Sequence, residues 1–315
     1  MPLYNCVALS QRCLETLRAT LPPGLAHEII LVDDGSTDGT RAWLDALGDG
    51  PCRALLNEHN LGYAAACNRG VAAARGEILA LVNNDLEFLP GWIEPMIEGL
   101  ARLPAAGIVG NIQRRVSTGE IDHAGIVIGA DGKPSHLRAP PSPGAPPGYA
   151  PMPAVTGACF VVPRALYSGI GGLDEQYRNS GEDVDFCFRV RAAGRTVWTA
   201  LASTVLHHVS ASPGRHDHVE QNSFRLFRKW RREIERAAWR SWCETFLADA
   251  RAGALPSDPQ AERAAERFLA GRCQRPGRWA ETQVAQNLLT EEARWEQMFP
   301  SMAAAPLHPD SRLST

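Results

Sequence analysis

The chain has 315 residues, 44% of them hydrophobic and 21% charged, so it can build a substantial core and is not a disordered chain. Its net charge of −3 and pI of about 6.3 provide no field of one sign, which argues against nucleic acid as a partner. No stretch reaches the roughly 18 apolar residues of a membrane span, and no signal-peptide pattern opens the chain. We therefore expect a cytoplasmic protein, and peripheral membrane contact stays open.

The eight cysteines form no Cys-x-x-Cys pair, and most lie inside apolar segments. Metal clusters and disulfide frameworks both need closer or more regular spacing. We expect buried free thiols.

Short apolar runs alternate with helical segments through the first 110 residues. This alternation predicts βαβ units, and hence an α/β domain with a mainly parallel, twisted sheet and helices on both faces. Ser36 or Thr37 is the expected cap of the second helix. Met1–Asn5 resembles the end of a strand with almost no strand before it, so we expect a truncated first strand or a true start that lies upstream. The expected strands are 28–32, 53–56, 78–82 and 108–110, and the expected helices are 10–21, 37–47, 63–75 and one opened by Pro90.

The alternation of predicted strands and helices stops at about residue 112. An antiparallel excursion is expected over 121–129, and a long surface loop over the Pro- and Gly-rich residues 131–153. A strand, a helix and another strand are then expected over 155–162, 182–193 and 195–199. We expect an α/β domain over 1–215, a helical appendage over 216–300, and a loose tail over 301–315.

The first acidic cluster, Val32-Asp33-Asp34-Gly35-Ser36, closes an apolar run. An open α/β sheet binds its ligand at the carboxyl ends of its strands, which is where Asp33 and Asp34 are expected. There a carboxylate can accept hydrogen bonds from a base N–H or a ribose hydroxyl. The alternative is a turn and helix cap, which would satisfy free backbone N–H groups instead.

The second cluster, Asn83-Asn84-Asp85, follows the predicted strand 78–82. A carboxylate there can hold Mg²⁺ or Mn²⁺, with phosphates and waters completing the coordination shell. The alternative is an ordinary Asn/Asp turn.

A glycine-containing helix start lies between these clusters, in the run Asn60-Leu61-Gly62-Tyr63 that leads to Asn68. Gly62 allows the backbone to approach a ligand closely, and the helix N-terminus behind it favours phosphate. The alternative is a helix packed tightly through its alanines. Both can hold at once.

The third cluster, Gly181-Glu182-Asp183, opens a predicted helix. Asp183 there can act as a general base on an acceptor hydroxyl, because a helix N-terminus keeps a carboxylate ionised. The alternative is a capping box between Ser180 and Asp183.

His207 and His208 end an apolar run. Adjacent side chains on a strand point to opposite faces, so we expect one histidine to face the crevice. A lone histidine is more often structural, but the need for further ligands around Asp85 favours a metal contact.

Several motifs in this order resemble the family 2 glycosyltransferases, and within them the rhamnosyltransferase-like and O-antigen-type members. The resemblance runs from Leu3 to about Trp230. It rests on the three acidic clusters and on four further runs, namely Asn60-Leu61-Gly62-Tyr63, Thr156-Gly157-Ala158-Cys159-Phe160, His207-His208, and the segment from Gln221 to Trp230.

The resemblance implies a GT-A fold that binds a nucleotide-diphospho-sugar, with a nucleotide-binding half over 1–111 and an acceptor half over 112–215. It also assigns roles to individual residues. The implied nucleotide-binding residues are Asp33, Asp34, Gly62 and Asn68, the implied metal ligands of Mn²⁺ or Mg²⁺ are Asp85 and His207, the implied catalytic base is Asp183, and further candidates are Tyr4, Asn5, Asn84, Glu182 and His208.

The chain departs from the family pattern at Asn83 and Asn84, which stand where its metal signature has acidic residues. The expected reaction is metal-dependent, inverting transfer of a sugar to a hydroxyl of a glycan or lipid-linked glycan. A dehydrogenase or methyltransferase is disfavoured because no Gly-x-Gly-x-x-Gly follows a first strand. The remaining alternative is a non-catalytic or impaired relative that binds sugar nucleotides.

Overall fold

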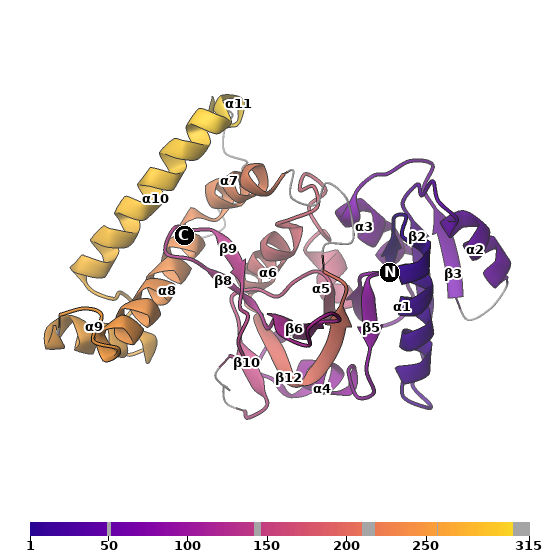
Figure 1. Cartoon of the computed structure of the whole chain (residues 1–315), viewed down its shortest axis with the longest axis horizontal. Helices are drawn as coiled ribbons and strands as arrows, with labels where there is room; N and C mark the ends of the chain where they lie inside the picture. Colours follow the sequence, from indigo (N-terminus) through magenta and orange to yellow (C-terminus); the bar gives the residue numbers. More distant parts are fainter. Residues whose placement is uncertain (49–51, 142–145, 210–217, 257, 305–315) are drawn as a thin grey trace. The chain divides into compact units, whose positions relative to one another are not determined.

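The computed structural model describes residues 1–48, 52–141, 146–209, 218–256 and 258–304 (Figure 1). The chain forms two compact units. The first comprises Met1–Ile126 and His136–Val219, and the second comprises Val127–Ser135 together with the chain from Glu220 onward.

The first unit begins with a three-stranded parallel sheet in the order β1-β2-β3. Leu3 pairs with Asp33, and Asp33 with Leu56, so the three strands end together. The loops that follow parallel strands therefore leave from one edge of this sheet. The strands are β1 (Pro2–Leu3), β2 (Ile29–Asp33) and β3 (Cys52–Leu56), and the helices gathered around them in Figure 1 are α1 (Val7–Thr20), α2 (Thr40–Leu47) and α3 (Tyr63–Ala73).

A larger, seven-stranded sheet completes the first unit, with the order β10-β12-β6-β11-β4, β5 on β12, and β7 on β6. The central β6 and β12 are parallel and the other pairings are antiparallel. Cys159 pairs with Val82, so the end of β4 is bordered by the segment that enters β11. His207 pairs with Leu86, so the end of β12 lies beside the start of β5. The strands are β4 (Ile78–Val82), β5 (Leu86–Phe88), β6 (Ala106–Arg115), β7 (Ile121–His123), β10 (Tyr149–Pro151), β11 (Cys159–Pro163) and β12 (Thr196–His207).

Apolar side chains of the larger sheet pack against helices α4 (Glu94–Arg102), α5 (Arg164–Gly169) and α6 (Glu182–Ala192). Trp92, Met96 and Val205 are fully buried in this core. Each such side chain contributes about 1.5–3 kcal/mol through burial. The core therefore holds the strand ends rigidly under the polar loops.

The second unit is mainly helical. Cys243, Leu247 and Ala280 are buried in one of its clusters, and Trp295 stacks on Phe224. No helix in the described part of the chain is both long and apolar enough to cross a membrane. The helices are α7 (Val219–Lys229), α8 (Arg231–Arg251), α9 (Pro259–Leu269), α10 (Arg278–Met298) and α11 (Pro300–Ala304).

A hairpin from the middle of the chain belongs to this helical unit. It consists of β8 (Ile126–Ile128) and β9 (Pro134–His136). The Ser241 hydroxyl donates to the Ile128 carbonyl at 2.6 Å, and the Asn287 amide donates to the Ala130 carbonyl at 3.3 Å. The helical unit therefore includes residues from the middle of the chain as well as the C-terminal residues. The sequence analysis had expected this unit to consist of C-terminal residues only.

Most predicted elements lie within a few residues of the observed ones, and two local predictions need correction. The predicted cap at Ser36 or Thr37 is wrong, because α2 begins later, at Thr40. The backbone N–H of Thr40 donates a hydrogen bond to the Asp38 carboxylate at 2.9 Å. The predicted loop over 131–153 contains β9 and β10, and its residues 142–145 lie outside the described ones. All eight cysteines are free, and the prediction of buried thiols is confirmed for six of them, whereas Cys6 and Cys273 are half-buried. Of the predicted tail, residues 305–315 lie outside the described part.

Glu220 joins the hairpin to α10 within the second unit. It accepts a hydrogen bond from the Trp295 indole at 2.6 Å, pairs with Arg294, and lies 3.5 Å from Lys133. Burial alone would raise the pKa of Glu220, but the two hydrogen bonds and the Lys133 charge lower it on balance. Its ionised form therefore stabilises the fold above the ordinary glutamate pKa, and this contribution disappears as pH falls toward the lower folded-state value.

We predict that Glu220→Gln destabilises the protein at pH 7 by about 1 kcal/mol, a modest cost because the side chain is partly exposed. Urea unfolding from pH 7 to pH 3 measures it, and the gap between variant and wild type should close below about pH 4. Glu296→Gln, an exposed change on α10 next to Trp295, is the matched control. A gap that stays constant with pH would contradict the assignment.

Candidate functional site

Three polar loops of the first unit meet on one short segment, Thr156–Ala158. The backbone N–H of Asn83, just after β4, donates to the Ala158 carbonyl at 2.8 Å. The N–H of Gly157 donates to Asp183 Oδ2 at 2.8 Å, and the Tyr63 hydroxyl donates to the Gly157 carbonyl at 2.6 Å. The loop after β4, the start of α3 and the start of α6 are thus fastened to the same three residues.

Asp34 fixes the approach to α3. Its Oδ1 accepts from the Asn57 amide at 2.6 Å and from the Leu61 N–H at 3.0 Å, and its Oδ2 accepts from the Gly62 N–H at 2.8 Å. Gly62 has a φ of +95°, which glycine adopts at little cost. A carboxylate has about four acceptor positions, so the three bonds leave room for one more.

Asp33 is completely buried at the end of β2. Its carboxylate accepts from the Ser36 N–H at 3.1 Å and pairs with Arg41 at 2.9 Å. A buried carboxylate needs such partners, because an unpaired charge away from water is costly. Nucleoside contact by Asp33 and Asp34 stays a prediction, and it would add to these internal bonds.

The turn between β1 and α1 is backbone-strained. Asn5 and Cys6 both have a φ of +55°, an uncommon value for residues other than glycine. The Asn5 N–H donates to the Ser36 hydroxyl at 2.8 Å, and Asn5 Oδ1 accepts from the Thr37 N–H at 2.8 Å. These bonds hold the turn against the loop after β2, while Tyr4 beside it is 42% exposed and available to a ligand.

Asp85 and His207 approach each other across the strand ends, with 3.4 Å between Oδ2 and Nε2. Two neighbouring ligands of one octahedral cation with bonds near 2.1 Å lie about 3 Å apart, so this spacing fits a shared divalent metal. The described residues include no group of three His, Cys, Asp or Glu side chains able to hold a metal.

Asp122, which the sequence analysis did not identify, lies behind His207. Its Oδ2 is 3.7 Å from His207 Nδ1, and its Oδ1 accepts from Arg115 at 2.8 Å. His207 and Arg115 hold the pKa of Asp122 well below its usual range. A carboxylate at Nδ1 directs Nε2 toward Asp85, an arrangement common behind metal-binding histidines.

His208 points elsewhere, as expected for neighbours on a strand. Its Nε2 lies 2.8 Å from Glu87, which also bonds Arg12 at 3.2 Å. Asn84, another candidate, donates to the Ser10 hydroxyl at 2.8 Å. Both side chains brace α1 against the loop after β4, and metal contact by either stays a prediction.

Asp183 lies at the start of α6 and is partly exposed. Gly181 caps this helix without a side-chain hydrogen bond, so the predicted capping box is not formed. The carboxylate accepts instead from the Gly157 N–H and, through Oδ1, from the Val184 N–H at 2.8 Å. Glu182 beside it is buried. The position and exposure of Asp183 suit a base, and its role stays a prediction.

Asn68 uses all its hydrogen-bonding groups inside the protein. Its amide donates to the Leu173 carbonyl and to Glu175, both at 2.9 Å. Its Oδ1 accepts from the Leu173 N–H at 2.9 Å and from the Tyr167 hydroxyl at 2.7 Å. A nucleotide contact by Asn68 stays a prediction, and it would require one of these bonds to break.

Tyr63, Gly157 and Asp122 complete the arrangement but were not singled out as site residues from the sequence. Tyr63 and Gly157 both lie in runs that resemble the family, and a glycine between two polar loops is a signal of close approach. Asp122 follows no strand-end pattern, so no local signal identifies it.

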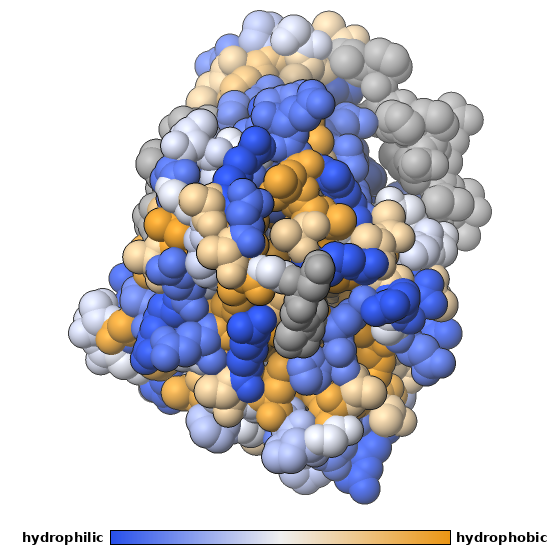
Figure 2. Space-filling model, turned by 90° about the vertical axis from the view of Figure 1, so that its right-hand side faces the viewer, coloured by the Kyte–Doolittle hydropathy of each residue, from blue (hydrophilic) through white to orange (hydrophobic). Residues whose placement is uncertain are grey.

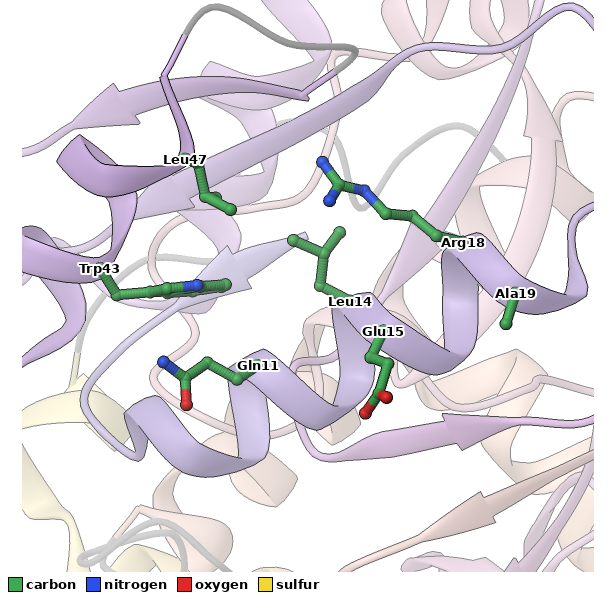
Figure 3. Close-up of a pocket in the computed structure, with 7 residues that line it drawn as sticks. All are labelled: Gln11, Leu14, Glu15, Arg18, Ala19, Trp43 and Leu47. Atoms are coloured by element: carbon green, nitrogen blue, oxygen red, sulfur yellow. The ribbon is translucent and has the colours of Figure 1, made fainter.

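A shallow hollow of about 460 Å³ lies elsewhere, between α1 and α2. Figure 3 shows Trp43 of α2 facing Leu14 and Gln11 of α1. Figure 2, which views the molecule from the α1–α2 side, shows hydrophobic residues among hydrophilic ones on this face. None of the seven lining residues is a predicted site residue, so the hollow is separate from the carboxylate loops.

Comparison with known families and curated proteins gives consistent matches. A sequence model of the family described as glycosyl transferase family 2 matches residues 1–168. The chain is 31% identical over 68% of its length to the O-antigen biosynthesis protein RfbC of Myxococcus xanthus, and 36% identical over 74% to the protein y4gI of Sinorhizobium fredii. It spans only 17% and 27% of those longer proteins.

A third relative is of more similar size. The N-acetylglucosaminyl-diphospho-decaprenol L-rhamnosyltransferase of Mycobacterium tuberculosis is 30% identical over 59% of the chain, which covers 68% of that protein. This match agrees with the predicted rhamnosyltransferase-like resemblance.

Solved structures confirm the predicted GT-A fold with added C-terminal helices. GalNAc-T7 in complex with UDP, GalNAc and Mn²⁺ aligns with a TM-score of 0.62 at 15% identity, covering 98% of this chain and 57% of its own. The mannosyltransferase PcManGT of Pyrobaculum calidifontis, with GDP-Man and Mn²⁺, aligns with a TM-score of 0.50 at 20% identity, covering 99% and 80%.

We predict that Asn68→Ala destabilises the protein by about 2–3 kcal/mol, because buried partners around residues 172–175 lose their bonds together. Urea unfolding should show a lower midpoint with an unchanged slope. Asn60→Ala, an exposed change just before α3, is the control. A loss no larger than that of the control would contradict the structural role.

Proposed function

Because the chain belongs to glycosyl transferase family 2, we propose that it transfers a sugar from a nucleotide-diphospho-sugar to a hydroxyl group, with inversion at the anomeric carbon. The observation that carries this proposal is the attachment of the Asp183 and Asp85 loops to one segment, Thr156–Ala158, with His207 beside Asp85. This attachment supports the proposal because it holds the loops that carry Asp183 and Asp85 against the same segment.

The donor side is proposed to lie over the carboxyl ends of β1 and β2. Asp33 and Asp34 end β2, the exposed Tyr4 follows β1, and Gly62 opens α3. Ligands of open α/β sheets bind at such strand ends. The related folds with UDP or GDP-Man support a nucleotide there, and which nucleotide this chain binds is left to experiment.

Asp85 and His207 are proposed to hold Mn²⁺ or Mg²⁺, with Asp122 orienting the histidine. When bound, the metal would supply positive charge that stabilises the departing diphosphate. Two protein ligands leave coordination positions for diphosphate oxygens, which is typical of metals that bind with their substrate. The Mn²⁺ in both related structures supports this choice.

Asp183 is proposed to accept the proton of the attacking hydroxyl. As the acceptor oxygen bonds to the anomeric carbon, the bond from that carbon to the diphosphate breaks, and its electron pair leaves with the nucleoside diphosphate. The proton passes to the Asp183 carboxylate, so charge and atoms balance. A carboxylate is a weak base, but the hydroxyl becomes acidic as the new bond forms.

The acceptor is proposed to be a glycan or a lipid-linked glycan. The name of the mycobacterial relative describes a diphospho-decaprenol acceptor, and that of the Myxococcus protein describes O-antigen synthesis. A non-catalytic relative that binds sugar nucleotides is the alternative, and the absence of acidic residues at Asn83 and Asn84 is the observation that favours it.

We predict that Asp183→Asn lowers turnover at least a hundredfold, because the amide cannot take the proton, while donor affinity changes less than threefold. Release of nucleoside diphosphate from UDP-, GDP- and dTDP-hexoses measures turnover, and calorimetry with the nucleotide measures affinity. Glu77→Gln, at an exposed carboxylate of the same unit, is the control for lost charge. Unchanged turnover in Asp183→Asn would refute the base assignment.

We predict that Asp85→Ala abolishes Mn²⁺-dependent nucleotide binding, and that Asp122→Asn weakens it about 10- to 100-fold. The difference arises because Asp85 would contact the metal, whereas Asp122 would act only through His207. Calorimetry of the nucleotide with and without Mn²⁺ separates the two effects. Equal binding by both variants and the wild type would remove the metal from the proposal.

A further inference from the structure

Gly157 lies directly between two side chains from different elements. Its carbonyl accepts from the Tyr63 hydroxyl at 2.6 Å, and its N–H donates to Asp183 Oδ2 at 2.8 Å. The carbonyl of this residue therefore bonds a side chain of α3, and its N–H bonds a side chain of α6. Tyr63 and Asp183 do not need to touch for one to determine the position of the other.

The space around Gly157 is correspondingly tight. A Cβ atom added there would lie 3.1 Å from the Tyr63 hydroxyl oxygen, 3.3 Å from Tyr63 Cε1, and 3.4 Å from Asp183 Cβ. These distances are at or below ordinary packing contact, so the glycine fills the gap between the two side chains. A side chain at this position would therefore crowd both Tyr63 and Asp183.

Tyr63 is also fixed on its other side, toward the proposed nucleotide. It follows Gly62, whose N–H is held by Asp34 at 2.8 Å. Three hydrogen bonds and the peptide bond between Gly62 and Tyr63 thus connect Asp34, through Gly157, to Asp183.

The tyrosine hydroxyl remains a donor. Burial raises the pKa of Tyr63 well above its ordinary value, and the nearby Cys67 and Glu182 raise it further. The hydroxyl therefore keeps its proton at neutral pH, where it can donate to the Gly157 carbonyl.

We propose that Tyr63 is a positioning residue for the transfer reaction, holding the Asp183 carboxylate in place through Gly157. This inference rests on the proposed function, because it requires Asp183 to be the base. It assigns the helix start next to the nucleotide a second role, that of orienting the proton acceptor. Misplacing a reacting group by about 1 Å can cost up to a hundredfold in rate, so the loss of one positioning bond is expected to be visible in turnover.

The first test is Tyr63→Phe, which removes only the hydroxyl. We expect turnover to fall about tenfold, while the Mn²⁺-dependent affinity for UDP, GDP or dTDP, whichever the wild type binds, stays within twofold. Calorimetry also counts the binding-competent molecules, so turnover is expressed per folded site. Tyr149→Phe is the matched control, because Tyr149 also donates its hydroxyl to a backbone carbonyl, that of Pro95, at 2.9 Å. The control should keep wild-type turnover.

The second test uses Gly157→Ala, alone and together with Tyr63→Phe. The single alanine should lower turnover because its Cβ crowds both side chains. The atom nearest that Cβ is the Tyr63 hydroxyl oxygen, which phenylalanine lacks. The double variant should therefore lose less activity than the product of the two single losses, which is the mark of coupled positions. Gly157→Ala also tests the inference if Tyr63→Phe fails to fold.

The outcomes separate this inference from the function on which it rests. Wild-type transfer that depends on Asp183, combined with full turnover in Tyr63→Phe, would overturn only the role of Tyr63. Equal losses of turnover and nucleotide affinity would overturn it as well, since they would indicate a donor contact. Absence of any transfer by the wild type, or full turnover in Asp183→Asn, would overturn the proposed function itself.

Discussion

The arrangement of the whole site depends on the two hydrogen bonds made by Gly157. Without them, the start of α3 and the start of α6 would lose their shared attachment to this residue. The adjacent bond from Asn83 to the Ala158 carbonyl brings the loop after β4 to the same place. Buried backbone groups must find partners, and here those partners are the polar loops themselves. The backbone N–H and C=O groups of this segment need hydrogen-bond partners, and those bonds bring Tyr63, Asn83 and Asp183 close to it.

The carboxylates of the first unit are compensated in two different ways. Asp34 and Asp183 accept mainly backbone N–H groups, which stabilise negative charge without adding a competing cation. Asp33 and Asp122 are paired with arginines and deeply buried. The first pair therefore has no arginine partner among these bonds, whereas an arginine balances the charge of each member of the second pair. The same residue type thus has different roles, according to whether an arginine reaches it.

Local patterns were sufficient to predict the strand ends and the acidic clusters after them, because a strand followed by polar turn residues is encoded within a few positions. The link from Tyr63 to Gly157 spans 94 positions in sequence, so no local pattern reveals it. Asp122 was missed for a similar reason. It lies near His207 only because β7 and β12 both pair with β6, and these strands are far apart in the sequence. The cap at Ser36 was predicted from propensity, and tertiary structure overrode it by using that hydroxyl for Asn5.

The hairpin at Val127–Ser135 makes the order of synthesis matter. A ribosome finishes these nine residues long before it reaches Glu220, yet their neighbours are the later helices, with Gly132 against Leu288 and Ile234. In the nascent chain Gly132 therefore has no partners until the later helices are made, and incompletely packed segments of this kind are prone to aggregate. Shortened versions that stop after β12 would leave the hairpin without these helices permanently, so loss of solubility in them would say nothing about catalysis.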